Sequence, residues 1–130
     1  MNAALNDQVA IAFKKASDAA FSLEQAFEEN GDMANAARAD DAVNELMQAA
    51  TDANAQSVTQ KLSTTQADKQ ILQQLTDKVN AAAGQIAASE AQVQKWVGVA
   101  TNATQLVASV ASGNLGGAIG KAQTIVRLLS

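Results

Sequence analysis

Two patterns in the sequence could support chemistry, and the first is a glycine-rich run, GNLGGAIGK, at positions 113–121. A phosphate-binding P-loop needs Gly six residues before its Lys and Ser or Thr directly after it, but these positions hold Leu115 and Ala122. A dinucleotide-binding fingerprint ending at Gly120 would also need Gly at position 115. The run therefore predicts a chain corner followed by the start of a helix, and no nucleotide site.

The second pattern is a set of carboxylate pairs spaced four residues apart, Glu24 with Glu28 and Asp41 with Glu45. Such pairs usually form a solvated helix face, and a weak cation site is the alternative. The chain has no His and no Cys, so the usual helical di-metal site and the familiar nucleophile–base pairs cannot be built. We therefore expect no catalytic residue, metal ion or cofactor, and a protein that is not an enzyme.

The composition predicts an all-α fold. The chain has 130 residues, is rich in Ala and contains no Pro, and its four aromatic residues are too few for a sheet protein. Apolar residues at alternating spacings of three and four predict helices at about 3–29, 33–62, 66–112 and 115–129, with a weak point at 51–57. Short corners between them favour an elongated antiparallel bundle of about four helices, forming a single helical domain over 1–130.

The most regular pattern belongs to the third predicted helix. The positions of its repeating pattern, which are apolar except for Ser89, run from Leu72 to Val110 without a slip, through Ile86 and Trp96. A continuous helix over 66–112 would be about 70 Å long, with coiled-coil-like packing. Gly84 and Gly98 are points where it could bend.

Charge divides the chain into two parts. All 13 acidic residues and seven of the nine basic residues lie in 1–95, whereas 96–130 carries only Lys121 and Arg127. The net charge of −4 argues against nucleic acid as a partner. No basic start followed by an apolar run is visible, so we expect no cleavable signal peptide and a protein that is cytoplasmic or exported without one.

The charge-poor end, 96–130, is predicted to be an apolar helical hairpin. Its apolar stripe widens after Trp96, and a wide stripe must be covered by the chain's own helices, by a protein partner or by a membrane. We expect a non-enzymatic interaction or assembly protein that contacts itself or another helical protein through this hairpin. The alternative is a soluble membrane-active protein of the pore-forming type that inserts 96–130. The predicted contact residues are Trp96, Val97, Val99, Leu106, Val107, Val110, Leu115, Ile119, Ile125, Val126 and Leu129.

Overall fold

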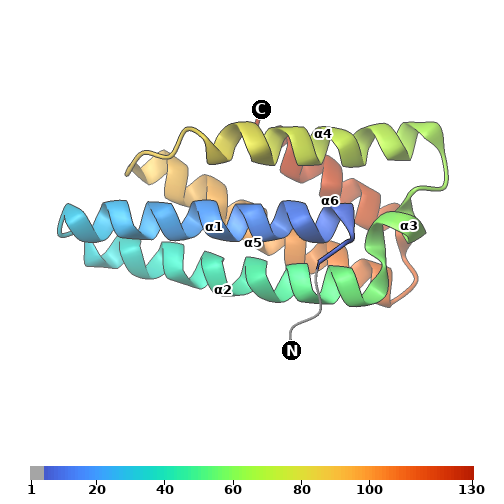
Figure 1. The fold of residues 1–130 in the computed structure, drawn as a ribbon, viewed down its shortest axis with the longest axis horizontal. Helices are drawn as coiled ribbons and strands as arrows, with labels where there is room; N and C mark the ends of the chain where they lie inside the picture. The colour runs from blue at the N-terminus through green and yellow to red at the C-terminus, as the bar shows by residue number, and fades with distance from the viewer. Residues whose placement is uncertain (1–4) are drawn as a thin grey trace.

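The regular structure of the protein is helical throughout the part of the chain that the computed structural model describes, residues 5–130. This confirms the all-α prediction, although six helices are present there instead of about four. The helices, drawn in Figure 1, are α1 (Gln8–Glu29), α2 (Met33–Gln56), α3 (Val58–Leu62), α4 (Gln66–Ala83), α5 (Glu90–Ala111) and α6 (Leu115–Leu128).

Two corners use the same local device, and both were predicted from the sequence. After α1, Gly31 adopts a φ of 75°, and the N–H groups of Gly31 and Asp32 donate to carbonyls in the last turn of the helix. After α5, Gly113 has a φ of 84°, and it makes the equivalent bonds together with Asn114. This geometry favours Gly because it has no Cβ. The side chains of Asp32 and Asn114 then cap α2 and α6.

The predicted weak point at 51–57 is a complete break between α2 and α3. Ser57 is left-handed there, with a φ of 53°. The break is fixed to the start of α1, because the Asp7 carboxylate caps α1 and also accepts bonds from the N–H and hydroxyl of Thr59, at 2.8 and 2.7 Å. The predicted helix start at Ala3 lies outside the described residues, and among those described α1 begins at Gln8.

The prediction of one long helix over 66–112 is wrong. The chain leaves the helix at Gly84 and re-enters it at Glu90, with Ser89 capping α5. The Gln92 side chain holds the loop by donating to the Gln85 carbonyl at 2.8 Å and accepting from the Ala87 N–H at 3.2 Å. Gly84 weakens the helix at this point, and the side-chain bonds of Ser89 and Gln92 stabilise the turn that replaces it.

Because the chain turns at 84–89, the bundle is only partly antiparallel. This corrects the prediction of an antiparallel bundle. The hairpins α1–α2 and α5–α6 are antiparallel, as the contact of Ser17 with Val43 shows for the first. By contrast, α2 runs parallel to α5, and α4 runs parallel to both α1 and α6 (Figure 1). Five of the helices therefore form a closed ring of neighbours in the order α1, α2, α5, α6 and α4.

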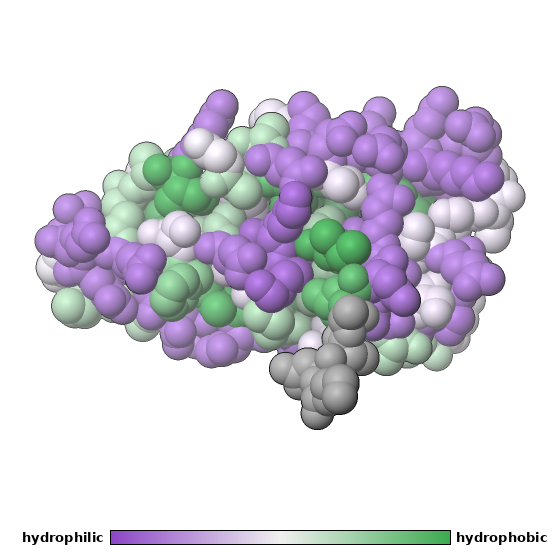
Figure 2. Space-filling view, viewed as in Figure 1, coloured by the Kyte–Doolittle hydropathy of each residue, from purple (hydrophilic) through white to green (hydrophobic). Residues whose placement is uncertain are grey.

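The core is a contiguous cluster to which every one of these helices contributes. Many of its members are Ala, so helices can approach closely, while large side chains such as Phe13, Leu46 and Trp96 fill the remaining space. On the face of the molecule in Figure 2, hydrophobic residues form small patches between hydrophilic ones.

Candidate interaction surface

The predicted contact residues of the C-terminal hairpin are mainly core residues. Seven of them are buried: Trp96, Val99, Leu106, Val107, Val110, Ile125 and Leu129. Val97, Ile119 and Val126 are half-buried against the core, and Leu115 alone among the eleven is exposed, at 37%. The wide apolar stripe is thus covered by the chain's own helices, which was one of the three possibilities that the sequence left open.

Gly98 explains how α6 closes over α5. A Cβ placed on Gly98 would lie 3.2 Å from a methyl carbon of Leu128, so the glycine allows the two helices to pack closely. Trp96, two residues earlier on α5, points towards the core and is 1% exposed. This close contact helps to hold α6 against α5 in the antiparallel hairpin.

The outward side of α5 is uncharged along its C-terminal half. We call this surface the α5 outer face and define it by its exposed residues: Thr101, Thr104, Gln105, Ala108, Ala111 and Ser112. The exposed surfaces of α1, α2 and α4 all include charged side chains. A helix surface without charge loses less hydration when another molecule covers it.

Several polar groups on and beside this face already have partners in the helix. The Thr101 hydroxyl donates to the Val97 carbonyl at 3.1 Å, and the Ser112 hydroxyl donates to the Ser109 carbonyl at 3.0 Å. The half-buried Asn102 amide donates to the Gly98 carbonyl at 2.8 Å. Because these donors keep their bonds without water, covering the face costs less than covering free hydroxyls would.

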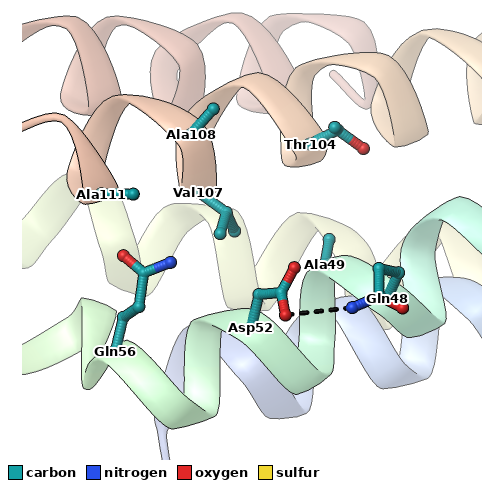
Figure 3. A pocket seen from close by; sticks show the side chains of 8 residues that line it. All are labelled: Gln48, Ala49, Asp52, Gln56, Thr104, Val107, Ala108 and Ala111. Atoms are coloured by element: carbon teal, nitrogen blue, oxygen red, sulfur yellow. Dashed lines mark hydrogen bonds between the residues drawn. The ribbon is translucent and has the colours of Figure 1, made fainter.

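A shallow groove follows the line where α2 and α5 lie side by side. We call it the α2/α5 groove, and it consists of two successive hollows with volumes of about 240 and 170 Å³. The larger hollow has Ala49, Val107, Ala108 and Ala111 as apolar walls, with Gln48, Asp52, Gln56 and Thr104 beside them (Figure 3). The smaller one is lined by Arg38, Asp41, Ala42, Glu45, Val97 and Thr101.

The two sides of the groove differ in charge. The α2 side presents the carboxylates of Asp41, Glu45 and Asp52, and the α5 side presents no charged residue. Arg38 is the basic residue of the lining, and its guanidinium donates to Glu90 at 2.7 Å. This hydrogen bond also holds the pKa of the Glu90 carboxyl below its usual value. The acidic side of the groove is therefore not neutralised by its own lysines or arginines.

The carboxylate pairs predicted from the sequence have different environments. Asp41 and Glu45 are both exposed, as expected for a solvated face. Glu24 is half-buried, and its Oε1 is enclosed without a hydrogen-bond partner. Desolvation by burial raises the pKa of Glu24 to about 7, and the neighbouring carboxyls of Asp40 and Glu28 contribute in the same direction. The sequence indicated Glu28, whereas the contact with Asp40 depends on the packing of α1 against α2.

Among residues 5–130, no group of three or more Asp and Glu side chains is arranged to hold a metal ion. Within the same range, no helix is both long and apolar enough to cross a membrane. Comparisons of the chain with protein-family models, with curated proteins and with solved structures gave no match in any of the three.

Proposed function

We propose that the protein is a non-enzymatic helical interaction module that contacts a helical protein, either a second copy or another chain, through the outer surface of its C-terminal hairpin. This keeps the hairpin as the contact element, but it moves the contact from the buried residues to the α5 outer face. Residues such as Leu106 and Val107 then support the surface from within instead of touching the partner.

One observation carries the proposal: the α5 outer face is uncharged, and the hydroxyls of Thr101 and Ser112 on it, with the Asn102 amide beside it, are already bonded within the helix. The main cost of covering a polar protein surface is the loss of hydrogen bonds to water. That cost is low here, while Ala108 and Ala111 permit close approach of another helix. The adjoining groove gives the surface a concave shape that a convex helix can enter.

The test uses a matched pair of substitutions. Ala108→Arg places a long charged side chain in the middle of the α5 outer face, and Ala67→Arg makes the same change on the exposed surface of α4. Light scattering measures self-association, and fluorescence anisotropy measures binding of labelled amphipathic helical peptides that differ only in the flanking residues, which are Lys, Gln or Glu.

We expect the unmodified chain either to self-associate or to bind at least one peptide. We further expect Ala108→Arg to weaken that contact at least about 10-fold, as a charge forced into an apolar contact should, and Ala67→Arg to leave it unchanged. A chain that stays monomeric and binds none of the peptides would overturn the proposal. Release of dye from anionic liposomes, accompanied by opening of α5 and α6, would replace it with the membrane-inserting alternative.

A further inference from the structure

The α2/α5 groove has the dimensions and the chemical asymmetry of a helix-binding site. Its lining on α2 recurs every three or four residues from Arg38 to Gln56, which is about 27 Å along the helix axis. Its lining on α5 follows the same spacing from Val97 to Ala111. Two hollows in line between two parallel helices match a rod-shaped occupant better than they match a compact small molecule.

We infer that this groove receives an amphipathic helix of a different protein, with Lys or Arg along the edge that meets α2 and small uncharged side chains along the edge that meets α5. The inference rests on the proposed function and specifies its partner. Asp41, Glu45 and Asp52 would each face a basic side chain, and Thr101, Thr104 and Ala108 would contact the uncharged edge.

Charge complementarity favours another protein over a second copy of this chain. The basic residues of this chain are few on each helix: Lys14 pairs with Asp18 at 2.9 Å, Lys69 and Lys78 each follow an Asp, and α6 carries only Lys121 and Arg127, six residues apart. No helix among residues 5–130 carries more than two basic residues, so none can match the three carboxylates on the acidic side of the groove. A separate basic helix would supply the complement.

Gln56 provides a second observation at the far end of the groove. Its side-chain oxygen is enclosed and accepts no hydrogen bond, although the residue lines the larger hollow (Figure 3). A buried amide oxygen without a donor is unfavourable. The terminal torsion of Gln is soft, so the amide can turn towards an N–H donor on an occupant. A Lys or Arg one turn beyond the partner of Asp52 would provide that donor.

The experiment uses a labelled, alanine-based helical peptide of about 18 residues, which matches the length of the groove. Lys occupies one edge and Leu the adjoining stripe, and a second peptide has Gln in place of every Lys. Asp52→Asn is compared with Asp77→Asn, because each Asp accepts a bond from a Gln amide four residues earlier at 3.0 Å. The two substitutions change the net charge equally, but Asp77 lies on α4, outside the groove.

We expect the Lys peptide to bind at least about 10-fold more tightly than the Gln peptide, since several ion pairs act together. Asp52→Asn should weaken binding of the Lys peptide about 3-fold, and the double substitution Asp41→Asn with Glu45→Gln should weaken it about 10-fold. Asp77→Asn should change the affinity for the Lys peptide less than about 2-fold. Binding of the Lys peptide should weaken as the salt concentration rises. The double substitution alters two exposed residues, so it keeps the test valid if Asp52→Asn disturbs folding.

Equal affinities of the Lys and Gln peptides, or equal effects of Asp52→Asn and Asp77→Asn, would overturn the inference. If the Gln peptide binds and Ala108→Arg removes its binding, the proposed function holds and only the basic partner is refuted. If neither peptide binds and light scattering shows a monomer, both proposals fail. Self-association through the groove, weakened by Asp52→Asn, would make a second copy the occupant and would also refute the inference.

Discussion

Replacement of Glu24 by Gln is expected to make the protein more stable at alkaline pH and to remove a pH dependence of stability that we expect of the wild-type chain. In the fold, Glu24 is half-buried on α1, with the carboxyls of Asp40 and Glu28 beside it. Its pKa is raised from 4.5 to about 7, chiefly because burial disfavours the charged form. Between pH 4.5 and about pH 7, Glu24 therefore retains a proton in the folded chain that it has already lost in the unfolded chain.

The direction of the effect follows from this difference in proton binding. The folded state has its full stability below pH 4.5, and it loses stability as pH rises through about 7. A difference of about 2.5 pKa units corresponds to at most about 3–4 kcal/mol. Because Glu24 is partly exposed and water screens its neighbours, we expect a loss of about 2 kcal/mol. Glu24→Gln has no charge to bury, so it should recover most of this amount above pH 7.

The assay is urea unfolding at a series of pH values, followed by the fluorescence of Trp96. This residue is the single Trp of a chain without Tyr and is 1% exposed, so its emission reports unfolding cleanly. Glu45→Gln, at an exposed carboxylate, is the control and should keep the wild-type pH dependence. The reasoning is refuted if Glu24→Gln retains the wild-type slope between pH 5 and pH 8, or if it is the less stable protein at pH 8.

Three further predictions concern stability. Leu106→Ala should lower the free energy of unfolding by about 2–5 kcal/mol because removal of the fully buried side chain leaves a cavity. Leu115→Ala should lower it by less than about 1 kcal/mol in the same urea titration because Leu115 is exposed. Equal losses would contradict the assignment of the hairpin to the core. Gly120→Ala should raise stability by about 0.5–1 kcal/mol because nothing lies within 4 Å of the added Cβ. Gly113→Ala should lower stability by about 1 kcal/mol because Gly113 has a φ of 84°. Thermal melts that rank the two variants in the opposite order would disprove this. Asp7→Ala should cost about 2 kcal/mol through loss of the α1 cap and of two bonds to the α2–α3 break, and unchanged amide exchange at the start of α1 would argue against this role.

The corners of the fold were predictable because their signals are local. Gly31 with Asp32, and Gly113 with Asn114, each combine a left-handed position with the cap of the next helix. The break at 84–89 was not predicted, because Ile86 and Ser89 continue the apolar spacing as if the helix went on. The spacing of Ser89 and Gln92 is that of a helix start, and together with Gly84 it was a local signal that competed with the periodicity.

The candidate surface depends on that break, and so the sequence could not predict it. Periodicity identifies Leu106 and Val107 as positions that must be covered, but it does not say whether the chain or a partner covers them. The α2/α5 groove requires α5 to run parallel to α2, and this happens only because the chain turns after Gly84. The carboxylates of α2 could be read from the sequence, but their position opposite an uncharged helix could not.

Two-dimensional amide NMR during titration with the Lys peptide tests the central claim most directly, because it locates the contact and reports on the hairpin at once. The account predicts shifts at exposed and groove-lining residues of α2 and α5, including Asp52, Thr104 and Ala108, while the buried amides of Val99 and Leu106 stay protected from exchange. Shifts centred on α1 or α4, or loss of protection at Val99 and Leu106, would contradict it.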